Sequence, residues 1–456
     1  MDVSVNKPRE QPPAAVPEKA KQAGEIHAKW LWTKPCVWTD NMLRALESGV
    51  KGDKWFSLID KVWKKENLRV AFDAVKRNKG AAGIDHISVR HFERNLDSQL
   101  ERLHQQLKEG RYQPQAARRK WIDKPGSKAR RPLGIPTVRD RVVETALKQV
   151  IEPIFEREFA DCSHGFRPGR GCRSALSEVD RLLKKEGKFT VVEVDIQRFF
   201  ERIDHDRLLE LVADRISDGR VLTLIESMLQ RGVMDDERHQ QTVEGTPQGG
   251  VISPLLANIY LNGLDHEMQQ AGYHLVRYAD DLVVLCDEPG QAPGALEHLS
   301  GWIESMGLTL HPDKTGVVEM TEPGAWFDFL GYRFMHARKS GKLRGFVSDK
   351  SKQRLRERTK PYLRRCNGRS LEAILAKINP ILRGWYGYFK HSNPASLGEM
   401  DGWVRMRLRC ILRKRRKQRG RGLGKSHHRW PNAYFVEHGL FTMAVAHAEE
   451  LQSSCR

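Results

Sequence analysis

The sequence predicts an α+β fold in which helices pack around an antiparallel sheet that carries acidic side chains at its strand ends. The first observation is the β-branched run Phe189–Asp195, which ends in an acid. The second is His274–Cys286, where two short apolar runs flank Tyr278-Ala279-Asp280-Asp281 without Gly or Pro. The third is a series of amphipathic stretches before and after these runs. The apolar runs predict one strand and a tight hairpin, and the amphipathic stretches predict the helices.

The charge of the chain is concentrated in its C-terminal third. The 456 residues suffice for two or three domains, and their formal net charge of +20 predicts a polyanionic partner. Residues 351–430 hold 23 lysines and arginines against four aspartates and glutamates, a net charge of +19. We therefore expect this third to bind the partner.

Cysteine spacing and hydropathy exclude several classes of protein. The seven cysteines, at positions 36, 162, 172, 286, 366, 410 and 455, form no Cys-x-x-Cys pair, so neither a zinc site nor a disulfide framework is expected. No stretch approaches the roughly 18 apolar residues of a membrane span, and the first residues are polar. A soluble, cytoplasmic chain with no membrane partner is therefore expected.

Three aspartates form the candidate catalytic site. The adjacent Asp280 and Asp281 repel one another, so a fold that fixes both at a hairpin tip is expected to hold divalent cations. Asp195, at the end of the other strand, completes an arrangement that can bind two Mg²⁺ for in-line displacement at phosphorus. An isolated Asp-Asp in a turn is more often a solvated cap. Here, however, Asp195 begins an Asp-Ile-x-x-Phe-Phe motif, and Thr246-Pro247-Gln248-Gly249-Gly250 lies between the two acidic segments.

With these motifs the chain resembles the intron-encoded proteins of bacterial group II introns, which are reverse transcriptases and maturases. The resemblance runs from about Leu68 to about Arg419. It implies a right-hand polymerase with fingers, a palm and a helical thumb. The implied catalytic residues are Asp195, Asp280 and Asp281, and the implied ligands of two Mg²⁺ ions are Asp195, Ile196, Asp280 and Asp281.

Five segments are expected in order along the chain. They are a disordered or loosely docked N-terminal arm (1–40), an N-terminal extension with the fingers (41–190), the palm (191–345), the thumb or maturase-specific X domain (346–422) and a short tail (423–456). The proline-rich first 25 or so residues lack the apolar content to fold. Trp30, Trp32 and Trp38 either form an interaction arm or dock on the body. The tail is too short for the DNA-cutting domain of some relatives, so a type without that endonuclease is expected.

Two helices of the body are predicted in enough detail to be tested. Arg139–Phe159 reads as an amphipathic core helix with a kink or break at Pro153. A second helix follows Ile203, with Asp204 as the better N-cap. His205 is expected to serve this helix entry, since two-metal phosphoryl transfer needs no histidine.

The resemblance also implies nucleotide-binding residues. Lys124 and Arg131 lie on a basic hairpin that suits a triphosphate, although such cations can also merely solubilise a hairpin. Phe200 would exclude a ribose 2′-hydroxyl, while Phe199 packs in the core. Gln248 would approach the base edges or sugar, and Lys314 would reach a phosphate or a palm carboxylate.

Contacts with nucleic acid are implied at several positions, each of which also has a plausible structural role. The motifs are the Lys79–Asp85 loop, the Gly165-Phe166-Arg167-Pro168 loop, the hairpin 328–334 and the basic helix Trp403–Arg419. The glycines of the first loop would let its backbone approach a strand. The implied contact residues are Lys79, Arg167, Tyr278, Gly331, Arg383, Arg413, Arg415 and Arg416.

We therefore expect an RNA-directed DNA polymerase of a group II intron, using an RNA template, a DNA primer and dNTPs. It would also bind intron RNA as a maturase and support retrohoming into target DNA. One alternative is an RNA-binding splicing cofactor without polymerase activity, and another is a domesticated reverse transcriptase in DNA repair or defence. The intact Tyr-x-Asp-Asp and Asp195 count against the first alternative, because three close carboxylates without metals repel one another.

Overall fold

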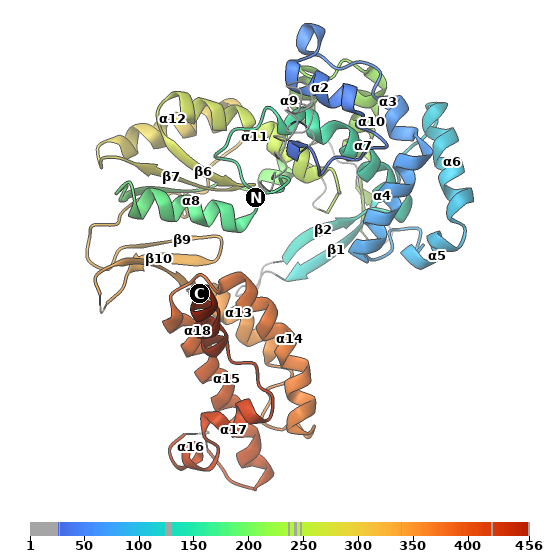
Figure 1. Ribbon diagram of the computed structural model, residues 1–456. Helices are drawn as coiled ribbons and strands as arrows, with labels where there is room; N and C mark the ends of the chain where they lie inside the picture. The colour runs from blue at the N-terminus through green and yellow to red at the C-terminus, as the bar shows by residue number, and fades with distance from the viewer. Residues whose placement is uncertain are drawn as a thin grey trace, which may run out of the picture. The chain divides into compact units, whose positions relative to one another are not determined.

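The structure is a computed structural model that describes residues 26, 28–123, 130–235, 238–240, 244–246, 249–338, 340–420 and 423–454. The chain divides into two compact units (Figure 1). The first comprises the residues up to Arg119, Gly134–Phe159 and Asp204–Tyr260; the second comprises Lys120–Leu133, Ala160–Ile203 and the chain from Leu261 onward. Within the described ranges, every helix is too short or too polar to cross a bilayer.

The first unit is mainly helical. α7 (Val138–Glu156) is its central helix, buried along most of its length. Thr137 caps it by accepting a hydrogen bond from the Asp140 amide at 3.1 Å. Pro153 lies in its last turn, so the predicted helix continues past the proline by one turn. The other elements of the unit are η1 (Lys51–Asp53), α2 (Asp40–Ser48), α3 (Ile59–Trp63), α4 (Lys65–Asn78), α5 (Val89–Arg94), α6 (Leu96–Lys108), α9 (His205–Ala213) and α10 (Gly219–Gln230).

The N-terminal tryptophans within the described residues dock on this unit. The Trp38 indole is buried, donates to the Gln149 carbonyl in α7 at 3.1 Å, and lies edge-on to Trp55 with ring centroids 5.3 Å apart. For Trp38, docking on the body is therefore the correct one of the two expected roles.

A four-stranded sheet has the order β2-β1-β4-β5. Its strands are β1 (Ala117–Asp123), β2 (Arg130–Ile135), β4 (Val233–Asp235) and β5 (Arg238–Gln240). β1 pairs in parallel with β4 through Ala117 and Val233, and β4 pairs antiparallel with β5. β1 and β2 form the expected basic hairpin, whose turn lies outside the described residues.

The second unit contains the predicted antiparallel sheet, which confirms the α+β class. Its order is β6-β7-β3-β8, with β3 (Thr190–Asp195), β6 (His274–Tyr278), β7 (Asp281–Cys286) and β8 (Gly316–Glu319). α8 (Cys172–Lys184) covers one face and α12 (Gln291–Ser305) the other (Figure 1). Alternate strand residues such as Val191 and Val283 pack against α8, as the two-residue period of a strand requires. α11 (Ser253–Gln270) runs from the first unit into the second.

A second, three-stranded sheet packs on the same core. It is antiparallel, in the order β11-β10-β9, with β9 (Trp326–Phe329), β10 (Tyr332–His336) and β11 (Leu343–Val347). Phe329 pairs with Tyr332, so Leu330 and Gly331 form a two-residue turn, and both have positive φ. Positive φ at both central residues is the signature of a type I′ hairpin turn.

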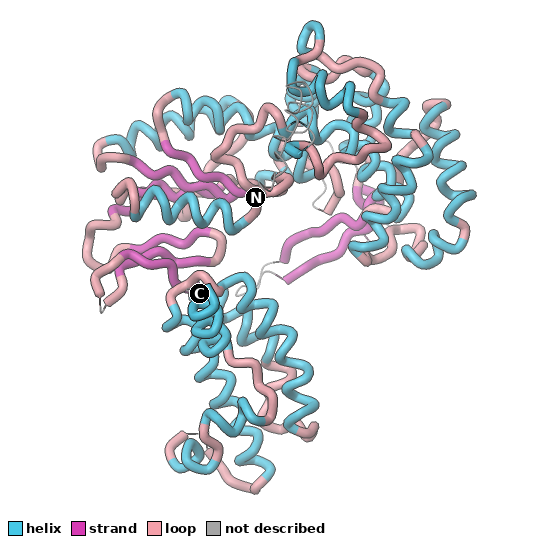
Figure 2. Tube along the Cα trace, viewed as in Figure 1, coloured by secondary structure: helices cyan, strands magenta, loops and turns pink. Residues whose placement is uncertain are grey.

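The described residues from Asp349 onward form helices joined by loops, with no strand among them (Figure 2). Its helices are α13 (Asp349–Thr359), α14 (Leu371–Phe389), α15 (Pro394–Arg415), α16 (Lys425–Arg429), α17 (Asn432–Glu437) and α18 (Met443–Ser454). Trp430, Phe435 and Met443 share one apolar core with α14 and α15. The Asp401 carboxylate of α15 accepts hydrogen bonds from the Met443 and Ala444 amides at 3.1 and 2.9 Å. The segment after residue 422 is therefore packed into the helical domain.

Candidate functional site

The register of the antiparallel sheet brings the three predicted aspartates together. Asp195, the last residue of β3, lies directly opposite Asp281, the first residue of β7. Directly opposed residues in antiparallel strands have Cα atoms about 4.5–5.5 Å apart. Asp280 precedes Asp281 in the hairpin turn. The three carboxylates are therefore carried by one end of this sheet.

The turn that carries Asp280 is strained. Tyr278 pairs with Asp281, which leaves Ala279 and Asp280 as a two-residue turn, and Ala279 has φ +57°. Positive φ at only the first central residue is characteristic of a type II′ turn, which favours glycine there. An L-residue in the left-handed region costs about 1–2 kcal/mol. Contacts around the turn must therefore stabilise it.

A buried ion pair between Arg277 and Asp265 stabilises this turn. The Arg277 guanidinium and the Asp265 carboxylate are both fully buried, and Arg277 Nε lies 2.6 Å from Asp265 Oδ1. Arg277 also donates to Ser163 Oγ at 2.8 Å and to the Ala279 carbonyl at 3.2 Å. The Arg277 side chain thus connects α11, the loop at residue 163 and the turn that carries Asp280. This role was not predicted from the sequence, although a lone arginine in an apolar strand signals a buried partner.

The loop before α8 packs directly on the same turn. The His164 amide donates to the Arg277 carbonyl at 2.8 Å, and the Arg277 amide donates to the Cys162 carbonyl at 2.9 Å. A Cβ on Gly165 would lie 2.5 Å from the Ala279 nitrogen, so only glycine fits there without a shift of the backbone. Gly165 therefore allows the loop before α8 to approach the turn that carries Asp280.

Arg167, from the same loop, does not fit its expected contact with a template backbone. Its side chain is only 7% exposed and donates to the Ala160 and Ser163 carbonyls at 2.5 and 2.8 Å. The guanidinium stabilises the chain turn before α8, a role that a charge pattern alone does not distinguish from phosphate binding.

The carboxylates lie in a charged environment. The pKa of Asp281 is raised to about 6, chiefly by burial and also by the negative charges of Asp280 and Asp195, while Arg131 and Lys314 oppose the shift. The pKa of Asp280 is also raised, chiefly by burial. The Asp281 side chain nevertheless reaches solvent. The crowding therefore favours a bound cation beside these groups.

Lys314 makes an ion pair with Asp195. This is one of the two contacts expected for it, the contact with a palm carboxylate. In the described part of the chain, no three His, Cys, Asp or Glu side chains are already arranged as a set of metal ligands. The backbone brings the aspartates together, while the Asp195 side chain is turned to the lysine.

The strand that carries Asp195 is held at its end. The Asp195 carbonyl accepts from the His311 amide and the Gln197 amide donates to the Thr309 carbonyl, both at 2.8 Å. Ile196, between them, is buried and bridges to Leu310.

The two phenylalanines after Asp195 separate as expected. They lie on the 3-10 turn η2 (Phe199–Glu201), where Phe199 is 1% exposed and Phe200 is partly exposed. Their ring centroids are 5.2 Å apart. One ring thus belongs to the core and supports the other.

Two helix-entry predictions are confirmed beside this turn. Asp204 caps α9 by accepting from the Arg207 amide at 2.9 Å. His205 is buried, with Nε2 2.7 Å from the Gly245 carbonyl, so it has a structural role at the helix entry.

Three expected contact residues of the second unit lie near its sheets. Tyr278 is partly exposed, with its ring centroid 5.9 Å from that of Phe166. A Cβ on Gly331 would lie 2.8 Å from Ser351 Oγ, and Gly331 lines a cavity of about 410 Å³ together with Arg354 and Trp385. Arg131 is exposed and acts electrostatically on Asp280 and Asp281. Lys124 and Gln248 lie outside the described residues.

The glycines of the Lys79–Asp85 loop are explained by packing within the first unit. A Cβ on Gly80 would overlap the Arg141 guanidinium, and one on Gly83 would lie 2.6 Å from Thr137 Cα. The expected reason for these glycines, approach to a nucleic-acid strand, is therefore not needed to explain them. Lys79 itself is exposed at the end of α4.

The expected RNA-contact arginines of the helical domain differ in their surroundings. Arg413 donates to Ser426 Oγ at 2.9 Å and to the Arg419 carbonyl at 2.5 Å, so it also holds the chain that follows α15. Arg415 and Arg416 are exposed, as are the neighbouring Lys414 and Lys417. Arg383 is exposed on α14, with its guanidinium 5.1 Å from the Phe441 ring centroid.

Comparisons with known proteins identify the matching families. Residues 122–334 match the family "Reverse transcriptase (RNA-dependent DNA polymerase)", and residues 350–430 match "Group II intron, maturase-specific domain". The chain is 32% identical over 351 residues to Protein YkfC of Escherichia coli (strain K12), covering 68% of this chain and 87% of YkfC.

A second relative is the Group II intron-encoded protein LtrA of Lactococcus lactis subsp. cremoris. Identity is 41% over 198 residues, covering 43% of this chain and 32% of LtrA. The chain therefore spans about a third of LtrA. Among solved structures, it is similar to telomerase from Candida albicans in complex with a fragment of telomeric RNA. That match has a TM-score of 0.39 and 16% identity, and it covers 70% of this chain and 63% of the other.

The buried ion pair between Arg277 and Asp265 is expected to contribute to the stability of the chain. Asp265→Ala leaves the Arg277 charge buried without a partner, which we expect to lower the free energy of unfolding by about 3–5 kcal/mol. Chemical denaturation of the full chain, followed by circular dichroism, measures this loss. The control is Asp161→Ala, which removes a 94% exposed partner of Arg170 and should cost about 0–1 kcal/mol. Equal losses in the two variants would contradict the anchoring role of Arg277.

Proposed function

The chain belongs to the family of group II intron-encoded proteins, which are reverse transcriptases and maturases, and from this membership we propose its activity. The right-hand polymerase fold is that of the family. We propose that the chain copies an RNA template into DNA by extending a primer 3′ end with dNTPs. It also binds intron RNA as a maturase and supports retrohoming into target DNA. The observation that carries the proposal is that Asp195 lies opposite Asp281 in the sheet, with Asp280 in the turn between β6 and β7.

The aspartates fit two Mg²⁺ ions as ligands. Mg²⁺ prefers oxygen donors and is commonly bound through carboxylates together with substrate phosphates. Burial raises the pKa of Asp281, and the neighbouring carboxylates of Asp280 and Asp195 raise it too, so a cation bound there would stabilise the ionised side chain. We assign Asp195, Asp280, Asp281 and the Ile196 carbonyl as ligands. When bound, two such ions lower the pKa of the primer 3′-hydroxyl and neutralise charge on the transferring phosphoryl group.

The cations beside the aspartates would bind the incoming triphosphate. Lys314 already compensates Asp195 through its ion pair, and Arg131 is close enough to lower the pKa of both hairpin aspartates. A triphosphate entering here would meet both positive charges, with Lys124 of the basic hairpin as a third cation. Arg131 and Lys124 then orient the phosphates, which is a large part of catalysis in phosphoryl transfer.

The remaining assignments concern the nucleotide sugar and the primer. Phe200, supported by Phe199, would fill the space of a ribose 2′-hydroxyl and so favour deoxynucleotides. Gln248 would lie near the base edges or sugar. Tyr278, next to the catalytic turn, and Gly331, in the β9–β10 turn, would contact the primer.

The exposed cations at the end of α15 would bind intron RNA. Arg415, Arg416, Lys414 and Lys417 follow one another along the chain, with no acid among them. Repulsion within such a run is relieved when a polyanion binds. Arg383 would extend this surface along α14, while Arg413 contributes mainly by holding the chain in place.

Loss of a metal ligand tests the polymerase assignment. We expect Asp280→Ala to lower Mg²⁺-dependent primer extension on an RNA template more than about 100-fold, because even groups that only support a metal ligand are worth 10–100-fold. Binding of intron RNA should remain largely intact. The control is Asp287→Asn, at the far end of β7, where the carboxylate pairs with Lys188. Undiminished extension by the Asp280 variant would remove its metal role.

The RNA surface is tested by removing charge. We expect Arg415→Gln/Arg416→Gln to weaken intron RNA binding and to reduce the slope of log K against log salt by roughly 0.7–0.9 for each lost phosphate contact. Arg90→Gln/Arg102→Gln makes the same charge change on exposed residues of α5 and α6 and should leave the slope unchanged. An unchanged slope in the Arg415/Arg416 variant would exclude this end of α15 as an RNA contact.

The sugar gate is tested by nucleotide selectivity. Phe200→Ala should narrow the kcat/KM preference for dNTPs over rNTPs by about 10–100-fold, the range that one steric contact contributes to discrimination. Phe200→Tyr retains the ring and should retain the preference. If Phe200→Ala still excludes ribonucleotides, the gate lies elsewhere.

A further inference from the structure

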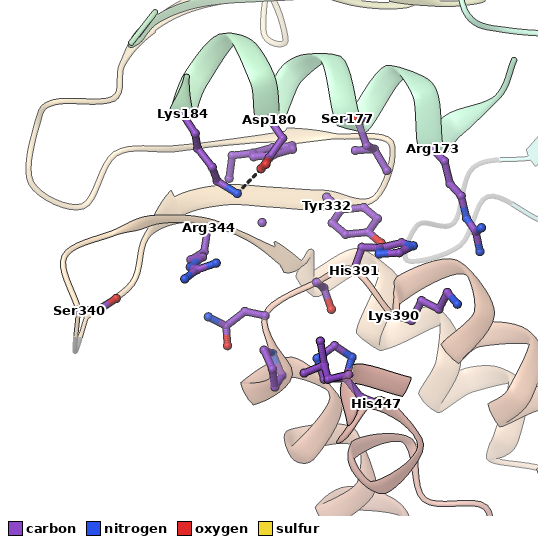
Figure 3. Close-up of a pocket in the computed structure, with 17 residues that line it drawn as sticks. Arg173, Ser177, Asp180, Lys184, Tyr332, Ser340, Arg344, Lys390, His391 and His447 are labelled. Atoms are coloured by element: carbon purple, nitrogen blue, oxygen red, sulfur yellow. Dashed lines mark ion pairs between the residues drawn. The ribbon is translucent and has the colours of Figure 1, made fainter. Parts of the chain in front are cut away.

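A cavity of about 800 Å³ lies in the second unit, apart from the aspartates. Figure 3 shows it between α8, the strands β10 and β11, the junction of α14 with α15, and α18. None of the residues assigned to catalysis, to nucleotide binding or to nucleic-acid contacts above lines it. The polymerase assignment therefore leaves this space unexplained.

The rim of the cavity carries an excess of positive charge. Lys184 pairs with Asp180, and Lys390 pairs with Glu450 at 2.9 Å, so two of its cations are compensated. Arg344 is exposed, and its guanidinium has no hydrogen-bond or ion-pair partner within the described ranges. In Figure 3 the Arg344 and Lys184 side chains approach the same space from opposite walls.

Arg173 adds a second uncompensated cation. Its guanidinium donates to the Gly387 carbonyl at 3.0 Å and has no carboxylate partner in the described chain. With Arg344 it leaves a surplus of about two positive charges, which matches one or two phosphate charges better than the charge of a triphosphate.

Two polar residues at the α14–α15 junction, Ser392 and His391, lie where a ligand could contact them. The Ser392 hydroxyl is buried, with the residue 3% exposed, and it has no hydrogen-bond partner among the described atoms. A buried hydroxyl without a partner is uncommon in folded proteins and points to a missing ligand or water. Burial lowers the pKa of His391, and the charges of Arg173 and Lys390 lower it further. The positive charges of Arg173 and Lys390 around this ring would attract a bound anion.

Apolar side chains also line part of the cavity. Leu176, Phe334 and Leu451 come from α8, β10 and α18, and Leu451 is 55% exposed. An apolar wall beside cations suits a ligand with a flat apolar part and a phosphate, which is the chemistry of a nucleotide.

We propose that this cavity holds an unpaired nucleotide of a bound RNA strand, its phosphodiester against Arg344 and its base along the wall formed by Leu176, Phe334 and Leu451. The Ser392 hydroxyl and the Arg173 guanidinium supply further polar contacts. This assignment rests on the proposed function only in taking RNA as the partner. The site would bind RNA through residues other than the three aspartates and the cations at the end of α15.

Binding of an unstructured ten-nucleotide oligoribonucleotide to the full chain tests the charge contact. We expect Arg344→Gln/Ser392→Ala to bind about tenfold more weakly, with the salt slope reduced by about 0.7 for one lost phosphate contact. Arg338→Gln removes an exposed cation from the same β10–β11 connection, outside the cavity, and should bind as the unaltered chain does. Primer extension on a short template should be the same in all three proteins, so failure of this inference is distinguishable from failure of the polymerase assignment.

Thiol footprinting tests the location. Leu451→Cys places a reactive thiol on the cavity wall, and Val445→Cys places one elsewhere on α18, at a residue that is 47% exposed. The oligoribonucleotide should slow alkylation at position 451 and leave position 445 unchanged, as read by peptide mass spectrometry. Adding Arg344→Gln should abolish the protection.

Three results would overturn the proposal. They are unchanged affinity of the Arg344→Gln/Ser392→Ala variant, equal protection at positions 445 and 451, and protection at 451 by AMP with none by the oligoribonucleotide. The last result would assign the cavity to a free nucleotide. A fourth result, equal protection by a DNA oligonucleotide of the same sequence, would overturn the assignment to RNA.

Discussion

The pairing of β3 with β7 is the constraint on which the candidate active site depends. Asp195 and Asp281 face one another only in this register. Because side chains alternate along a strand, a slip of one residue would turn every apolar side chain of the moved strand to the opposite face. The apolar residues that pack against α8 and α12 therefore also set the position of the acids. The core thus stabilises an arrangement of charges that is unfavourable by itself.

The backbone of the turn before Asp280 and Asp281 is strained, and contacts from neighbouring residues stabilise it. Ala279 is held in the left-handed region, and a two-carboxylate pair follows it. The buried Arg277 donates to the Ala279 carbonyl, while Gly165 lets the preceding loop reach the Ala279 backbone. Arg277 is in turn held by Asp265 of α11 and by Ser163 in the loop before α8, so segments distant in sequence support the turn. The turn is consequently determined by tertiary packing and not by its own residue preferences.

Much of the fold follows from local sequence patterns. The β-branched run, the hairpin, the amphipathic helices and the Asp204 cap were all predicted, because each depends on periodicity or on a cap within a few residues. Phe199 is buried and Phe200 partly exposed, as expected, although the two residues lie on a 3-10 turn and not on a continuing strand. The roles of Arg277 and Gly165 were not predicted, because the groups that explain them, Asp265 and the Ala279 backbone, become neighbours only in the folded chain. Arg167 and Gly80 show the reverse case, since a basic or glycine-containing loop that resembles a nucleic-acid contact is used for internal packing.

The ion pair between Lys314 and Asp195 makes the occupants of the active site thermodynamically dependent on one another. If Asp195 binds a cation as proposed, that cation competes with Lys314, and a phosphate bound to Lys314 would compete with Asp195. Each ligand then removes a competitor of the other, so the affinity of either rises when the other is present, and by the same factor in both directions. A metal ion and a nucleotide would therefore bind most tightly when both are present. A divalent ion alone would bind more weakly than it would to three aspartates without the lysine.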